Sequence, residues 1–201
     1  MFNAVLRRKW VVGGLAGLGL AVVVAGAWKF GVLPKANNAP TIGGPFRLTD
    51  QNGAAIDERV LRGSWSAIYF GYTFCPDACP TTLTSLAATQ ARLAAAHRNL
   101  RVVFISVDPA RDTPAQLKAY LSSPAFPKQT LGLTGSPAQV AAVAHAYGVY
   151  FKQAGKGADY SVDHTSIIYL MDPEGRFSRP IGYGLSPDDM AAQINQAIAG
   201  R

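Results

Sequence analysis

The sequence predicts an α/β fold, with a central mixed sheet flanked by helices, and an N-terminal transmembrane helix before it. Three observations in the 201-residue chain support this: an uncharged apolar run near the start, short apolar strands alternating with helical patterns, and a late hairpin turn. Strands that alternate with helices indicate a sheet covered on both faces, and the hairpin adds antiparallel strands. A thioredoxin-like arrangement is the leading interpretation.

The predicted membrane anchor spans residues 10–28, which carry no charge and approach the ~20 residues needed to cross a bilayer. A basic cluster at residues 7–9 directly precedes it. Positive residues stay on the cytoplasmic side, so we expect residues 1–9 in the cytoplasm and everything after the anchor outside. A cleaved signal peptide is the alternative, because the run ends in an A-x-A-like site at Ala27.

The charge distribution argues against a nucleic-acid partner despite the formal net charge of +7. Five of the 19 lysines and arginines lie in the first 35 residues, so the remaining 14 nearly balance the 12 acids. Later residues show no run of bases, which excludes the basic footprint of a nucleic-acid-binding protein.

Residues 29–44 are rich in proline, glycine and asparagine and are predicted to form a linker, and the folded domain is expected at 45–201. Its first strand is expected at 46–49. A second strand is predicted at 66–72, which is aromatic and apolar, and a third at 100–107, which is continuously apolar.

Helices follow from apolar spacing and from capping signals. Residues 80–97 place apolar side chains at helical intervals, with Pro80 suited to the first helical position. Three later helices are predicted where a hydroxyl cap precedes a proline, at Thr113-Pro114, Ser136-Pro137 and Ser186-Pro187. The remaining strands are expected at 129–133, 149–152, 166–171 and 177–183.

Both cysteines lie in one segment, G-Y-T-F-C-P-D-A-C-P at residues 71–80, with C-x-x-x-C spacing. If the helix starts at Pro80, Cys79 caps it, and the helix N-terminus lowers the pKa of that thiol. Paired thiolates select soft ions such as Cu(I) or Zn(II), and they can also form a disulfide. A structural disulfide is disfavoured, because a bridge between Cys75 and Cys79 constrains the unfolded chain little.

His164 directly precedes the predicted strand 166–171, which should neighbour the strand leading to Cys75. An imidazole beside two thiolates makes a donor set suited to copper, and Asp163 is placed to orient it. A structural role for His164 stays open on spacing alone. Asp77 could act as an acid or base in thiol exchange, or simply form the turn.

Other candidates are assigned structural roles. His97 and His145 are expected to be structural or on the surface, and Met171 is expected in the core. Residues 108–114 are predicted to form a turn braced by aspartate and arginine, entering a helix.

Three stretches, residues 71–80, 106–114 (S-V-D-P-A-R-D-T-P) and 162–177 (V-D-H-T-S-I-I-Y-L-M-D-P-E-G-R-F), resemble the Sco/SenC family, which assists copper delivery to cytochrome c oxidase. The resemblance covers the chain from about residue 45 to its end. It implies a thioredoxin-like fold with Cys75, Cys79 and His164 as copper ligands. Thr165 departs from the serine common at its position, without altering a ligand.

The resemblance implies a membrane-anchored metallochaperone that carries a copper ion to the dinuclear copper site of cytochrome c oxidase subunit II. A periplasmic copper donor or thiol reductase would be a further partner. The expected location is a bacterial inner membrane with the domain in the periplasm, in preference to a mitochondrial inner membrane. The alternatives are a thiol-disulfide oxidoreductase that reduces the acceptor's cysteines and a copper or redox sensor. A peroxidase is disfavoured, because a distant histidine suits metal binding better.

Overall fold

A computed structural model of the chain describes residues 41–200. The predicted cytoplasmic segment 1–9, the anchor 10–28 and most of the linker 29–44 lie outside the described residues. Within 41–200, no helix combines the length and apolar character needed to cross a membrane.

The described residues are built around a seven-stranded mixed sheet in the order β2-β1-β5-β4-β3-β8-β9. Three central strands, β3, β4 and β5, run parallel; β8 pairs antiparallel with β3, and β9 pairs antiparallel with β8. This arrangement confirms the predicted mixed α/β sheet. The strands are β1 (Arg47–Asp50), β2 (Ala55–Asp57), β3 (Trp65–Gly71), β4 (Leu100–Ser106), β5 (Leu131–Thr134), β8 (Ile168–Met171) and β9 (Phe177–Ile181).

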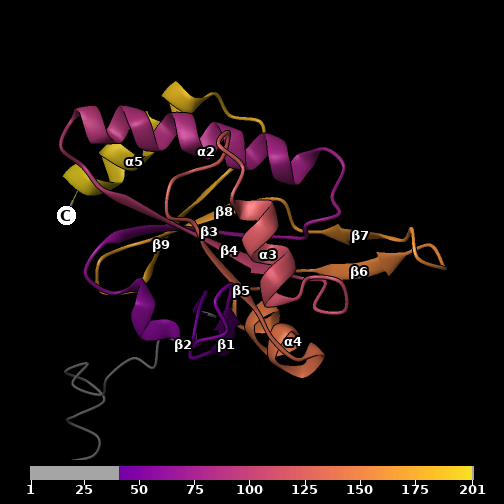
Figure 1. Ribbon diagram of the computed structural model, residues 1–201. Helices are drawn as coiled ribbons and strands as arrows, with labels where there is room; N and C mark the ends of the chain where they lie inside the picture. The colour runs from indigo at the N-terminus through magenta and orange to yellow at the C-terminus, as the bar shows by residue number, and fades with distance from the viewer. Residues whose placement is uncertain (1–40, 201) are drawn as a thin grey trace, which may run out of the picture. The chain divides into compact units, whose positions relative to one another are not determined.

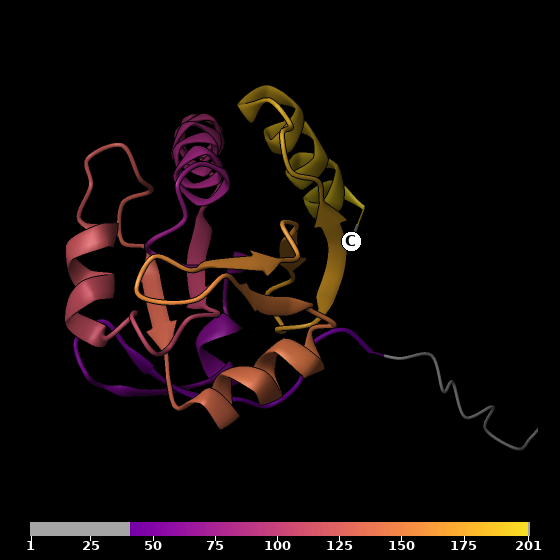
Figure 2. The same ribbon diagram turned by 90° about the vertical axis from the view of Figure 1, so that its right-hand side faces the viewer.

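Helices cover both faces of the sheet, as predicted. α2 and α5 lie together over one face and α4 lies over the other (Figures 1 and 2). Thr113, Ser136 and Ser186 each accept a hydrogen bond from the backbone N–H three residues on, which confirms the three predicted caps. The helices are α2 (Ala78–Ala95), α3 (Pro114–Leu121), α4 (Pro137–Ala146) and α5 (Pro187–Ala199), with a 3₁₀ turn η1 (Glu58–Leu61).

The start of α2 differs from the prediction. The helix begins at Ala78 rather than Pro80, and Asp77 is its N-cap residue. Proline is tolerated throughout the first turn, where its missing N–H would lack an intrahelical partner anyway, so Pro80 marks the first turn without fixing its first residue. Cys79 therefore lies inside the helix, and the prediction that it forms the cap is wrong.

A second, two-stranded antiparallel sheet is formed by β6 (Phe151–Ala154) and β7 (Ser161–His164). We call residues 151–164 the hairpin; Figure 1 shows it extending beyond the main sheet. Phe151 pairs with His164, which places the histidine at the base of the hairpin. The prediction placed His164 in a loop, because the polar segment S-V-D-H lacks a strand's usual apolar content.

All seven residues of β3 are buried, because the strand is covered on both faces. Tyr69 faces α2 and contacts Cys79, while Phe70 points to the other face and packs on Tyr147 and Tyr169. The carboxyl end of β3 is thus a firmly packed base for the segment that follows it.

Candidate metal centre

The two cysteines follow β3 in a segment that we call the cysteine loop, residues 72–79. The Cys75 N–H donates to the Tyr72 carbonyl at 3.2 Å, which turns the chain, and α2 then begins. The Cys79 N–H donates to the Cys75 Sγ at 3.3 Å. This turn brings the two thiols together, with Cys75 half-buried and Cys79 at 0% exposure.

Gly71 allows the cysteine loop to pack against the sheet. A Cβ at this position would lie 2.8 Å from the Cys79 Sγ and 2.9 Å from the Phe104 ring. Separations this short mean that even an alanine would displace the thiol or the ring. This role of Gly71 was not predicted from the sequence, although a glycine ending a buried strand indicates a close approach of another segment.

His164 reaches the cysteines because of the strand order. β8 runs antiparallel to β3, with Tyr69 opposite Ile168, so residues just before β8 lie at the carboxyl end of β3. The His164 Nε2 is 3.7 Å from the Cys79 Sγ. The potential ligand atoms of Cys75, Cys79 and His164 all lie within 4.8 Å of one another.

The orientation of the imidazole leaves Nε2 available as a ligand. Its Nδ1 is 3.0 Å from the Thr165 carbonyl oxygen, which can only accept, so Nδ1 carries the proton in this arrangement. Asp163, predicted to orient the ring, is exposed, and neighbouring side chains of a strand point to opposite faces. The Thr165 carbonyl therefore takes the role expected of Asp163.

Asp77 is exposed at the start of α2, where its carboxylate accepts from the Thr81 hydroxyl at 3.2 Å. Its backbone N–H hydrogen-bonds to Cys75. This geometry agrees with the turn-forming interpretation of Asp77.

The pKa values of the two thiols are shifted in opposite directions. A hydrogen bond from the Cys79 thiol, together with the backbone N–H groups of Cys79 and Asp77, lowers the pKa of Cys75 to about 3. The pKa of Cys79 is raised by the same bond to Cys75 and by burial. The prediction that Cys79 is the activated thiol is wrong, because the amides at the start of α2 point at Cys75.

The donor set and its spacing fit a soft metal ion. For bonds of about 2.0 Å to nitrogen and 2.3 Å to sulfur, a trigonal ion holds its nitrogen and sulfur donors about 3.7 Å apart. The observed Nε2–Sγ distance of 3.7 Å to Cys79 equals this value. Two sulfurs and one imidazole favour Cu(I) or Zn(II) over Mg²⁺ or Ca²⁺.

Aromatic rings surround the histidine, and the site opens to the surface beside Cys75. Tyr69 and Tyr72 contact the imidazole edge-on at centroid distances of 6.2 and 5.9 Å. Phe74, next to Cys75, is 52% exposed. A metal here would be shielded on one side and accessible on the other.

The other candidate ligands do not join this group. His97 and His145 are exposed, as expected, and Met171 is buried in the core. Within residues 41–200, Cys75, Cys79 and His164 are the group found with metal-ligand spacing.

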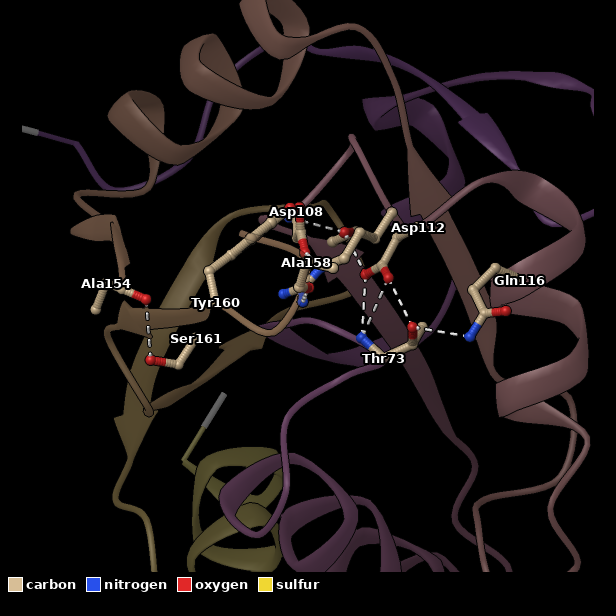
Figure 3. Close-up of polar contacts among 10 residues, drawn as sticks. Thr73, Asp108, Asp112, Gln116, Ala154, Ala158, Tyr160 and Ser161 are labelled. Atoms are coloured by element: carbon tan, nitrogen blue, oxygen red, sulfur yellow. Dashed lines mark hydrogen bonds and ion pairs between the residues drawn. The ribbon is translucent and has the colours of Figure 1, made fainter. Parts of the chain in front are cut away.

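The predicted turn at 108–114 is present, and Figure 3 shows its Asp112 bonded to Thr73, two residues before Cys75. Arg111 forms an ion pair with Asp108 at 2.5 Å, and Asp112 accepts from the Thr73 N–H and hydroxyl at 3.1 and 2.7 Å. Parallel strands β3 and β4 end at the same edge of the sheet, so the residues that follow them meet there.

Comparisons with known proteins agree with this geometry. The family model SCO1/SenC matches residues 34–199. The mitochondrial protein SCO2 of Saccharomyces cerevisiae is 40% identical over 168 residues, covering 82% of this chain and 55% of that protein. The chain spans about half the length of the curated relatives it matches.

Two solved structures show the same fold. ScoI of Bradyrhizobium japonicum, solved with copper bound, is 45% identical with a TM-score of 0.70, covering 78% of this chain and 99% of that one. BsSco, for which a disulfide switch is described, is a member of the Sco family of cytochrome c oxidase assembly proteins. It is 27% identical with a TM-score of 0.61, covering 79% of this chain and 94% of its own.

Proposed function

The chain belongs to the SCO1/SenC family, and from this premise we propose that it is a membrane-anchored copper metallochaperone for cytochrome c oxidase. Its cargo is a copper ion, held by Cys75, Cys79 and His164. The acceptor is the dinuclear copper site of subunit II. The observation that carries the proposal is the S₂N donor group, with all ligand atoms within 4.8 Å of one another.

The unequal thiols determine how copper enters. Cys75 is already a thiolate at neutral pH, so it offers the first bond without losing a proton. Cys79 holds its proton until a metal ion replaces it, because metal binding requires the thiolate and releases the proton. Loading therefore releases about one proton.

The site geometry suits transfer as well as binding. Three ligands leave one side of the ion open, and the exposed segment at Phe74 provides access to an acceptor. Incoming thiolates can then replace the three ligands one at a time. A closed four-ligand site would instead favour permanent binding.

The same proposal covers the placement of the domain. Residues 10–28 serve as a single-pass anchor in a bacterial inner membrane, 29–44 as the linker, and 45–201 as the periplasmic copper-binding domain. The basic residues 7–9 directly before the anchor support this orientation.

A thiol-disulfide oxidoreductase is the second candidate, and the asymmetric thiols favour it. The Cys75 thiolate would attack a disulfide of the acceptor, forming a mixed disulfide and releasing one acceptor thiolate. Cys79, after losing its proton, would attack Cys75, forming the Cys75–Cys79 disulfide and releasing the second acceptor thiolate. The low pKa of Cys75 suits the first step, while the raised pKa of Cys79 slows the second.

The two functions separate in a transfer experiment with the copper-binding domain of subunit II. The copper-loaded chain is offered to acceptor whose cysteines are already reduced, and copper transfer is followed by absorbance. The metal-free reduced chain is offered to the disulfide form, and acceptor thiols are counted. A chaperone succeeds in the first arm; success only in the second arm would replace the chaperone proposal with the reductase.

A further inference from the structure

The three ligand residues come from two segments that are connected to the rest of the fold in different ways. Cys75 and Cys79 follow β3 and begin α2, both of which belong to the packed core. His164 ends a strand of the hairpin, which forms a two-stranded sheet of its own. The distance between the imidazole and the thiols therefore depends on what ties the hairpin to the cysteine loop.

The turn at 108–112 ties down the cysteine loop. Asp112, at 0% exposure, accepts from both donors of Thr73, two residues before Cys75, and from the Ser106 hydroxyl at 2.6 Å. Gln116 donates to the Thr73 hydroxyl at 3.1 Å, as Figure 3 shows. Buried bonds of this kind are costly to break, so this end of the cysteine loop is fixed.

The same turn holds the hairpin. The Tyr160 hydroxyl donates to the Asp108 Oδ1 at 2.6 Å. Arg111 donates to the other oxygen of Asp108 at 2.5 Å and to the Ala158 carbonyl at 3.2 Å. Its guanidinium also lies 3.6 Å from the centre of the Tyr160 ring, a close cation–π contact.

Arg111 connects the two segments directly, because it also stacks on Phe74 of the cysteine loop at 4.6 Å. One five-residue turn thus contacts the segment that carries the thiols and the segment that carries the imidazole. Tyr160 directly precedes β7 and lies four residues before His164; Tyr160, Val162 and His164 are buried or half-buried while Ser161 and Asp163 are exposed, so Tyr160 and His164 share the inward face.

We propose that Tyr160, through its hydroxyl bond to Asp108, is a positioning residue that holds His164 within bonding distance of a copper ion on Cys75 and Cys79. Arg111 supports it by clamping the Tyr160 ring and the Ala158 carbonyl. This inference rests on the proposed copper-binding function. It adds that residues outside the site hold the third ligand, His164, in position.

The rival account is that nearby contacts alone place the imidazole. Tyr69 and Tyr72 contact the ring, and the Thr165 N–H donates to the Tyr150 carbonyl at the hairpin base at 2.9 Å. If these contacts suffice, loss of the Tyr160 hydroxyl changes nothing at the metal. The two accounts therefore differ in a measurable way.

The test compares Tyr160→Phe with Ser161→Ala in the full chain. Tyr160→Phe removes one hydroxyl and keeps the ring on Arg111. Ser161→Ala removes the neighbouring hydroxyl, whose bond to the Ala154 carbonyl stays within the hairpin (Figure 3). The two changes thus differ in whether they cut the tie to the 108–112 turn.

Each protein is loaded anaerobically with Cu(I), its affinity is measured by competition with a chromophoric chelator, and its ligands are counted by X-ray absorption. For Tyr160→Phe we expect two sulfurs, a weakened or lost nitrogen contribution and an affinity about 10-fold lower, within the range for removing a group behind a ligand. Ser161→Ala should match the unmodified chain.

Hydrogen exchange on the metal-free proteins gives a second readout. Hairpin amides at 152–164 should exchange faster in Tyr160→Phe, while amides at 72–79 keep their protection. Arg111→Lys, which retains the charge but loses the planar guanidinium, should show the same pattern. This variant provides an independent test if Tyr160→Phe folds poorly.

Unchanged affinity, ligand count and hairpin exchange in Tyr160→Phe would overturn the positioning role. Failure of the unmodified chain to bind copper with a nitrogen ligand would instead overturn the proposed function. The two failures are therefore distinguishable in one set of measurements.

Discussion

The cysteine loop and the hairpin supply the same proposed site but are held in different ways. The loop continues a strand that is buried at every residue and leads into the long helix α2, whereas the hairpin pairs only with itself and is tied by side chains to the 108–112 turn. The thiols therefore depend on the central sheet and α2, whereas the imidazole depends on the contacts that hold the hairpin. Changes to those contacts should affect the third ligand more than the thiol pair.

Among changes to the two segments, replacing a thiol of the cysteine loop should have the largest effect on copper affinity. Cys75→Ser removes the thiolate that offers the first bond, so copper affinity should fall by more than the 10–100-fold typical of removing a group behind a ligand. Chelator competition measures the loss. If this variant still retains stoichiometric Cu(I) under the same competition, the cysteine loop does not supply the main copper ligands.

The acidity of Cys75 predicts an unusual pH profile. Its lowered pKa of about 3 means the thiolate persists as pH falls, and it protonates only near that value. Alkylation of the metal-free chain should change little between pH 5 and 8, whereas an ordinary thiol with a pKa of about 8.5 gains roughly 10³-fold over that range.

Mass spectrometry of the alkylated peptide measures this profile, and Cys79 serves as an internal control. Because its pKa is raised and it is buried, Cys79 should stay unmodified across the range. A rate at Cys75 that climbs tenfold per pH unit would contradict the assigned acidity.

Removing the hairpin ligand should weaken the site without destroying it. His164→Ala leaves both thiols in place, so we expect lower copper affinity with two-sulfur coordination and unchanged reduction of a small disulfide substrate. Chelator competition and a thiol-release assay give the two values. Equal copper affinity in the variant and the unmodified chain would remove His164 from the ligand set.

The hydrogen bonds that attach the cysteine loop to Asp112 should contribute to the free energy of unfolding. Asp112→Asn places an amide donor among the Thr73 and Ser106 donors, which should lower the free energy of unfolding by about 1–3 kcal/mol. Urea unfolding measures it, with the exposed Asp159→Asn as a control for the charge change. A loss no greater than in that control would show that Asp112 does not hold the loop.

Asp163→Asn should have the smallest effect. Asp163 is exposed and the Thr165 carbonyl accepts from the imidazole, so copper affinity should stay within the ~0.5 kcal/mol typical of surface changes, about twofold. A tenfold loss would restore Asp163 as the residue that orients His164.

The sequence predicted the fold where signals are local. The capped helices at Thr113, Ser136 and Ser186 follow from a hydroxyl and a proline in adjacent positions, and β3 and β4 follow from apolar runs. β7 was missed, because its polar residues pair with a neighbouring strand that no local pattern reveals.

The sequence predicted which residues form the proposed site better than it predicted their ionisation and the contacts that position them. The proximity of His164 to the thiols followed from strand order, and its ligand role from resemblance to a family. Which thiol is ionised depends on where the helix amides point, and the Tyr160–Asp108 contact joins residues 52 positions apart. Those features arise from tertiary packing and leave little trace in local sequence.

The most direct test of the copper assignment is anaerobic reconstitution of the full chain with Cu(I), followed by X-ray absorption at the copper edge. The account predicts one copper per chain, bound by two sulfurs and one nitrogen. A chain that fails to retain stoichiometric copper would contradict it.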